Sequence, residues 1–266
     1  MSRLRPLARL ARLIGVVIAC VIPHLLARRR GVSPWPQRFL ARAAHATGFD
    51  VRIEGTPLLH DVFFIANHVS WIDILALGGA TGTAFISKDD VARAPIVGWL
   101  AAQNNTVFIT RERRGAVSGQ IDAVRAALAA HQPIALFPEG TTGDGRSLLP
   151  FKPALFSVLL PPPRSILIQP VVIDYEAATA LVAWKDGESG IANALRILGA
   201  PGRRTLTLRF LDPFDPGDHP DRKALAAETR ARITATMGQQ GRLDIQRPSL
   251  APSAPKSDRS LAFNVS

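Results

Sequence analysis

The sequence is poor in cysteine and in aromatic residues, and each shortage excludes a class of protein. One cysteine, Cys20, occurs among 266 residues. A single cysteine excludes an intrachain disulfide framework and provides no cluster of metal ligands, so we expect neither a metal nor a cofactor. Aromatic residues form 6% of the chain. That is too few for a surface that stacks nucleic-acid bases, and no stretch resembles a nucleic-acid-binding module.

Acidic residues are absent from the first 30 positions, which hold seven arginines. The remaining positions hold 25 basic and 21 acidic residues, so most of the net charge of +11 lies in this N-terminal arm. Because the arginines flank apolar residues, the arm indicates contact with anionic lipid before it indicates nucleic acid. We therefore expect a membrane surface as a partner and no nucleic acid.

A long apolar run covers residues 13–26 and has arginines on both sides. Fourteen helical residues extend about 21 Å, less than the hydrocarbon core of about 30 Å, which argues against a transmembrane span. The pattern favours a helix lying in one leaflet, and the charge bias places it on the cytoplasmic face of the cell inner membrane. A removed signal peptide is the alternative, although residues 23–30 form a poor cleavage site.

Strand and helix patterns alternate after residue 50, which predicts an α/β domain with a mostly parallel or mixed sheet flanked by helices. We expect membrane-associating helices at 1–48, one main domain at 49–238 and a disordered tail at 239–266. Strands are predicted at 51–54, 62–66, 83–87, 106–109, 134–137, 166–172, 180–184 and 205–210. Helices are predicted at 13–26, 37–47, 72–77, 94–100, 116–130 and 220–237.

Polar residues follow three of these strands at the point where each strand ends. His68 and Asp73 follow the first strand, Arg111 follows the second, and Glu139 follows the third. Because the carboxyl ends of parallel strands share one edge of a sheet, we expect these groups to converge in one crevice. The set suits a substrate that has a hydroxyl to deprotonate and an anion to hold. The simpler alternative is a helix start, since Ser70 and Asp73 have capping-box spacing.

These motifs resemble those of one known family, the glycerolipid acyltransferases of the 1-acylglycerol-3-phosphate acyltransferase type. Asn67-His68-Val69-Ser70-Trp71-Ile72-Asp73 matches the family's NHxSxxD signature, and Phe137-Pro138-Glu139-Gly140-Thr141 resembles its FPEGT motif. Residues 107–111, the pair Phe151-Lys152, and residues 169–172 are similar to three further blocks. The blocks occur in family order across residues 50–215.

The resemblance implies an enzyme that moves a fatty acyl group from acyl-ACP or acyl-CoA onto the free hydroxyl of a lysolipid. It makes His68 the general base and Asp73 the carboxylate that fixes the tautomer of the imidazole. Five residues on an ideal helix turn about 140°, so His68 must precede the first helical turn for the pair to meet. The chain has no GxSxG elbow and no positioned cysteine, and we therefore predict direct attack without an acyl-enzyme.

The remaining site residues are also assigned by the resemblance. It implies that Arg111 binds the phosphate of the acceptor and that Glu139 lines the acceptor pocket. It adds a further set of substrate-binding residues, namely Gly140, Thr141, Thr142 and Lys152. The alternatives are a solvated charge for Arg111 or Lys152, and a simple turn carboxylate for Glu139.

Thr142 is the departure from the family pattern that bears most on the substrate. Many relatives that form phosphatidic acid have arginine at this place, whereas a bacterial subset with Thr-Thr includes enzymes that acylate lyso-ornithine lipid, which has no phosphate. We expect 1-acyl-sn-glycerol 3-phosphate as the acceptor, giving phosphatidic acid, with lyso-ornithine lipid as the alternative. A non-catalytic lipid-binding membrane protein and a lipid hydrolase are the alternatives of other classes.

Overall fold

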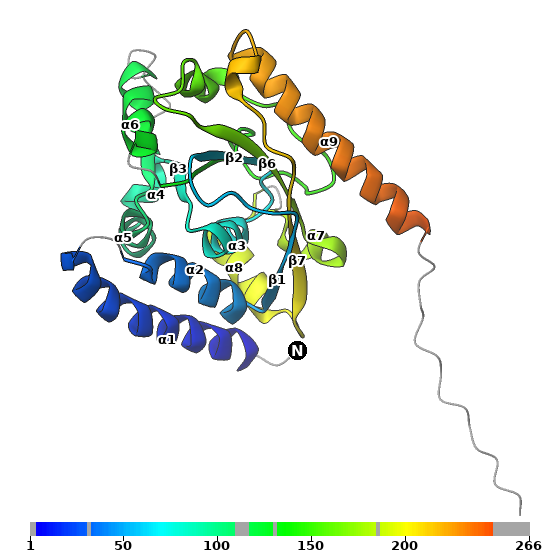
Figure 1. Cartoon of the computed structure of the whole chain (residues 1–266). Coiled ribbons are helices and arrows are strands. Elements are labelled where there is room, and N and C mark those ends of the chain that lie inside the picture. Colours follow the sequence, from blue (N-terminus) through cyan, green and yellow to red (C-terminus); the bar gives the residue numbers. More distant parts are fainter. Residues whose placement is uncertain (1–3, 31–32, 110–116, 130–131, 185–186, 247–266) are drawn as a thin grey trace, which may run out of the picture.

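The core of the fold is a twisted sheet of seven strands with helices on both faces (Figure 1). The computed structural model describes residues 4–30, 33–109, 117–129, 132–184 and 187–246. Across the sheet the strands run in the order β1-β7-β6-β2-β5-β3-β4, and β6 and β7 are antiparallel while the other neighbours are parallel. This confirms the predicted mixed α/β sheet. The strands are β1 (Phe49–Glu54), β2 (Val62–Ala66), β3 (Ala84–Lys88), β4 (Val107–Ile109), β5 (Ile134–Leu136), β6 (Leu167–Asp174) and β7 (Arg204–Phe210).

The central strand β2 is buried on both faces, as expected of a strand between two helical layers. Phe64 belongs to the core under α3 and α8, while Phe63 and Ile65 belong to the core under α6 and α9. Each of these side chains contributes about 1.5–3 kcal/mol by leaving water. The α-helices in the described residues are α1 (Leu4–Ala27), α2 (Trp35–Ala46), α3 (Ile72–Thr81), α4 (Asp89–Arg93), α5 (Pro95–Gln103), α6 (Val117–Ala129), α7 (Thr179–Val182), α8 (Gly190–Gly199) and α9 (Arg222–Gln246).

Three predicted elements differ from the structure in type or by many residues in length, and two of them follow residue 175. The apolar residues expected to form a strand at 180–184 instead contribute to the short helix α7. A run this short has no period that separates strand from helix, and a 3-10 turn at Glu176–Ala178 starts the helical path. The last helix continues to Gln246, past its predicted end at 237, and residues 247–266 of the predicted tail lie outside the described residues.

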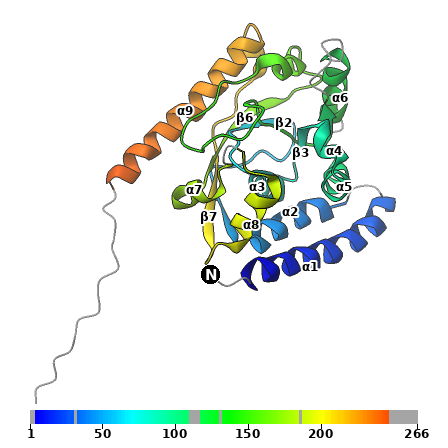
Figure 2. The same ribbon diagram turned by 180° about the vertical axis from the view of Figure 1, so that it is seen from behind.

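Helix α1 is longer than the apolar run that predicted it. It begins at Leu4 and has 24 residues, or about 36 Å of helix, so the argument from length against a membrane span was wrong. Within the described part of the chain it is the one helix long and apolar enough to cross a membrane. It nevertheless lies along α2 in both views (Figures 1 and 2), and Arg9 Nη1 donates to the carbonyls of Ile197 and Leu198 at the end of α8.

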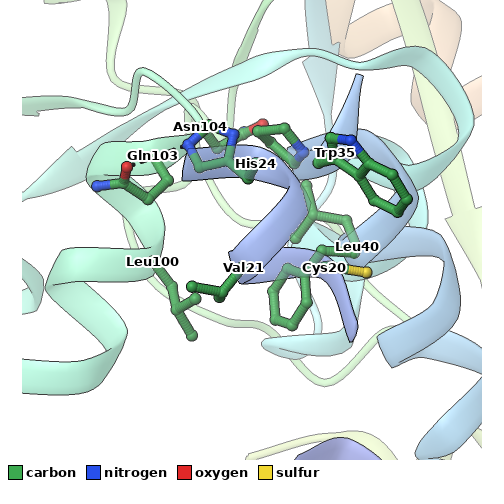
Figure 3. A pocket seen from close by; sticks show the side chains of 10 residues that line it. Cys20, Val21, His24, Trp35, Leu40, Leu100, Gln103 and Asn104 are labelled. Carbon is green, nitrogen blue, oxygen red and sulfur yellow. Dashed lines mark hydrogen bonds between the residues drawn. The ribbon is translucent and has the colours of Figure 1, made fainter. Parts of the chain in front are cut away.

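A small apolar seam joins α1 and α2 to α5 (Figure 3). Cys20 and Leu40 contribute buried side chains to it, and the space between the helices is only about 30 Å³. At its end His24 is hydrogen-bonded to Ser33 Oγ (2.8 Å) and Gln103 Oε1 (3.1 Å). The N-terminal helices are thus packed on the domain that carries the sheet.

Candidate active site

The chain leaves the sheet at Asn67, directly after β2. The Asn67 side chain is buried, and its amide group forms two hydrogen bonds with the backbone of Ile173 on β6. Its Nδ2 donates to Ile173 O (3.0 Å), and its Oδ1 accepts from Ile173 N (2.8 Å). These two bonds tie the end of β2 to β6. They fix where His68 departs from the sheet.

Asp73 is the centre of the site's hydrogen bonding. Its carboxylate is fully buried, and Oδ2 accepts from His68 Nδ1 (2.8 Å), Val69 N (2.7 Å) and Ser70 N (3.0 Å). Helix α3 begins only at Ile72, so His68 precedes the first turn as the spacing required. The helix-start interpretation and the catalytic interpretation are therefore compatible, since one carboxylate binds both the loop amides and the imidazole.

Tyr175 is a member of the site that the sequence did not indicate. It is the only tyrosine in the chain, and its hydroxyl donates to Asp73 Oδ1 at 2.5 Å. Burial, together with the negative charge of Asp73, raises the pKa of Tyr175 well above its ordinary value, which keeps the hydroxyl protonated as a donor. The signal available was its place directly after β6, since β6 is parallel to β2 and ends at the same edge.

The His68 ring faces a cavity of about 380 Å³. It stacks on Phe137 with ring centroids 4.2 Å apart, and 18% of its side chain is exposed. Because Nδ1 donates to Asp73, Nε2 is the ring nitrogen left to accept a proton from a substrate. The cavity is lined by His68, Ile86, Lys88, Phe137, Gly140, Thr141, Thr142 and Trp184. Sequence reasoning missed Lys88 and Trp184, which have no motif around them.

Glu139 lies beside the dyad, but its carboxylate is engaged with backbone. Its Oε1 accepts from His68 N (2.7 Å) and its Oε2 accepts from Leu149 N (2.9 Å). Burial raises the pKa of Glu139, although the two N–H donors oppose that effect. Gly143 N also donates to His68 O (2.7 Å), so the turn at residues 139–143 holds both the N–H and the carbonyl of His68. These contacts favour a positioning role over the acceptor-binding role that the resemblance implied.

The other predicted residues are distributed over two cavities. Gly140, Thr141 and Thr142 line the cavity that holds His68. Lys152 lines a neighbouring cavity, which also includes Glu139 and Thr141. Arg111 lies outside the described residues. The structure therefore brings together the dyad and the FPEGT turn, and it places Lys152 beside them rather than among them.

Replacing Glu139 by glutamine separates positioning from acceptor binding. The glutamine side chain has one oxygen, whereas the backbone N–H groups of His68 and Leu149 each bond to a different oxygen of Glu139. One N–H group would lose its acceptor, so we expect the free energy of unfolding to fall by about 1–3 kcal/mol. We also expect kcat to fall while the KM for the acceptor changes less than twofold. Thermal unfolding and steady-state kinetics measure the two effects. A large rise in acceptor KM at unchanged kcat would instead support direct contact with the acceptor.

The arrangement can perform general-base chemistry on a hydroxyl. The imidazole accepts the proton at Nε2, and the buried carboxylate of Asp73 stabilises the imidazolium that results. Thr141 and Thr142 line the same cavity. In the residues that the structure describes, no three His, Cys, Asp or Glu side chains are grouped to hold a metal ion.

Comparison with known proteins agrees with this geometry. A family model described as Acyltransferase matches residues 28–174. The lyso-ornithine lipid O-acyltransferase of Pseudomonas aeruginosa is 34% identical over 248 residues, covering 88% of this chain and 93% of its own. The 1-acyl-sn-glycerol-3-phosphate acyltransferase of Neisseria meningitidis serogroup B is 29% identical over 244 residues, covering 89% and 93%.

The fold has a counterpart among solved structures. The crystal structure of the 1-acyl-sn-glycerophosphate (LPA) acyltransferase PlsC from Thermotoga maritima superposes with a TM-score of 0.64 at 20% identity, covering 89% of this chain and 98% of that one. This likeness extends to the sheet and its flanking helices, and the family model spans more than half of the sequence. The chain belongs to the acyltransferase family.

Proposed function

We propose that this acyltransferase moves a fatty acyl group from a thioester to the free hydroxyl of a lysolipid at a membrane surface. The observation that carries the proposal is the His68–Asp73 pair, held in a fixed geometry at the wall of a cavity. The acceptor hydroxyl gives its proton to Nε2 as its oxygen attacks the thioester carbonyl. The C–S bond then breaks, and the proton passes from the imidazolium to the leaving thiolate.

The acceptor we propose is lyso-ornithine lipid, with 1-acyl-sn-glycerol 3-phosphate as the alternative. Two observations support this order. The relative named for lyso-ornithine lipid is 34% identical, against 29% for the one named for 1-acyl-sn-glycerol 3-phosphate. In addition, Thr142 lines the cavity where an arginine would suit a phosphate, and Lys88 is the one cation among the described residues lining it. A single cation suits a carboxylate headgroup.

The membrane contact we propose is an apolar platform on α1, α5 and α8. One side of α1 packs on the domain, and its other side exposes leucines and isoleucines along the whole helix, a pattern typical of a helix lying in the interface. Arg9 joins α1 to α8, and Gln103 joins it to α5. The platform consists of Leu4, Leu7, Leu10, Ile14, Ile18, Ile22, Leu25 and Leu26 on α1, Ile96, Val97 and Trp99 on α5, and Ile191 and Leu195 on α8.

The first residue of α8 lies beside a side chain that lines the catalytic cavity. Trp184 lines that cavity and is partly exposed, and a side chain built at Gly190, the first residue of α8, would meet the Trp184 ring at 3.5 Å. A lysolipid that lies in the leaflet beside α8 therefore has a short path to His68. The arginines of α1 suit the anionic surface of such a leaflet.

A panel of acceptors tests the substrate. With one labelled thioester and vesicles containing either lysolipid, we expect kcat/KM for lyso-ornithine lipid to exceed that for 1-acyl-sn-glycerol 3-phosphate. Thr142→Arg should raise the use of the phosphate acceptor by about tenfold, because arginine forms charge-assisted hydrogen bonds with phosphate. Product mass identifies the acceptor used.

The matched control is Thr56→Arg, on the exposed loop between β1 and β2. This loop precedes β2 and so lies at the edge of the sheet opposite His68, and the control should leave both rates unchanged. A preference of the unmodified enzyme for 1-acyl-sn-glycerol 3-phosphate would reverse the proposed order. Release of free fatty acid without an acceptor would indicate a hydrolase, and binding without any product would indicate a lipid-binding protein.

A further inference from the structure

Two more cavities lie between the catalytic cavity and α9. Thr141 lines both the catalytic cavity and a second cavity of about 500 Å³, beside residues 149–154 and Arg222. Pro150, Phe151 and Pro153 line this second cavity and also a third, of about 330 Å³, along α9. The second and third cavities are called the α9 groove here. Because Thr141 lines both the second cavity and the catalytic cavity, the groove lies next to the space in front of His68.

The α9 groove has an apolar wall and a basic far end. Near Thr141 the wall is formed by leucine, proline and phenylalanine side chains. The lining cations are Lys152 and Arg222 in the second cavity and Lys223 and Arg230 in the third, which lies along α9. The acidic residue that lines the groove within the described residues is Glu139, whose oxygens are both occupied by backbone donors. The far end therefore attracts an anion.

The segment that forms the wall is held in place by hydrogen bonds that its backbone makes with other parts of the chain. Lys152 N donates to Pro138 O (2.9 Å), and Arg230 Nη2 donates to Leu148 O (2.9 Å). At the start of α9, Asp221 Oδ1 accepts from Lys223 N (2.8 Å) and Ala224 N (2.9 Å). Its carboxylate is thus used as a helix cap, while the Arg222 and Lys223 side chains are exposed.

The groove and the apolar platform lie at opposite ends of the molecule. Both views place α1 at the bottom and the beginning of α9 at the top (Figures 1 and 2). If α1 rests on the leaflet, the groove opens to water. A lipid acceptor and a soluble donor would then reach His68 from different sides.

We infer that the α9 groove binds the phosphopantetheine arm of the thioester donor, which is common to coenzyme A and acyl carrier protein. The inference rests on the proposed function. The arm is a thin chain of methylenes and two amides that ends in a phosphate ester. Its apolar parts fit the wall beside Phe151, and its phosphate fits the cations Arg222 and Lys223. The thioester then lies at Thr141, next to Nε2 of His68, where the C–S bond is exchanged for a C–O bond.

Three donors that carry the same acyl chain test this assignment. They are acyl-CoA, acyl-ACP and the S-acyl derivative of N-acetylcysteamine, which keeps the thioester but has neither the phosphate nor most of the arm. In the double variant Arg222→Ala/Lys223→Ala, the KM for the phosphate-bearing donor should rise about tenfold with kcat within twofold. The kcat/KM for the truncated donor should not change.

The matched control is Arg52→Ala, an exposed arginine on β1 at the far edge of the sheet. It removes a positive charge away from the groove and should leave all three donors unaffected. If the unmodified enzyme uses acyl-CoA alone or acyl-ACP alone, a rise in the KM for the donor that it uses supports the site and shows which donor carries the arm. An unchanged KM, or an equal loss with the truncated donor, overturns the inference. Absence of transfer by the unmodified enzyme with every donor would instead count against the proposed function.

Discussion

His68→Ala is expected to lower kcat/KM for thioester-dependent acylation by about 10³-fold, within the range that a positioned general base contributes. The acceptor hydroxyl has a pKa far above neutrality, and His68 Nε2 is the atom proposed to take its proton during attack. The loss should appear in kcat, because the imidazole acts on the proton in the transition state rather than on substrate binding. Labelled product formed per unit time, measured with saturating acceptor, gives the effect.

His60→Ala is the control for this variant, since His60 is an exposed histidine with no motif partner. It should retain full activity. Circular dichroism and thermal unfolding should show both variants folded, because His68 itself is not part of either core cluster. Turnover of His68→Ala within tenfold of the unmodified enzyme would remove the histidine from the mechanism.

Asp73→Asn is expected to lower kcat by a similar factor of about 10³. The buried carboxylate accepts hydrogen bonds from an imidazole, two backbone amides and the hydroxyl of Tyr175. The asparagine side chain has an NH2 group in place of one carboxylate oxygen, and this group cannot accept a hydrogen bond from the donors that it faces. The imidazole then carries its proton on Nε2, where it cannot accept one from the substrate. The unsatisfied donors also cost about 1–3 kcal/mol of unfolding free energy.

Asp218→Asn, which changes an exposed carboxylate, is the control for this variant and should leave kcat unaltered. A kcat of Asp73→Asn within tenfold of the unmodified enzyme, in a folded protein, would contradict the role of the Asp73 carboxylate.

Much of the site could be predicted because its first elements are local in the sequence. The apolar residues of β2 and the pattern of α3 fixed the position of His68 at a strand end, and five-residue spacing required that it precede the helix. Parallel strands end at one edge, so the neighbourhood of the dyad and the FPEGT turn also followed. Local patterns could not show that both carboxylate oxygens of Glu139 accept hydrogen bonds from backbone amides. The donors, at His68 and Leu149, are brought to Glu139 by the folding of the chain.

By itself, therefore, the sequence determined the α/β architecture and the meeting of His68 with Asp73, because both depend on periodicity or spacing within a few residues. The resemblance of its motifs, in order along the chain, indicated the family. The tertiary structure alone decided the contacts across long separations. Tyr175 is 102 positions from Asp73 and reaches it only because β6 pairs with β2 in a particular register. In the same way, the length and exposed face of α1 and the groove beside α9 depend on packing between distant segments. The physical reason is that hydrogen bonds and cavities between segments are set by sheet register and core packing, which no short stretch encodes.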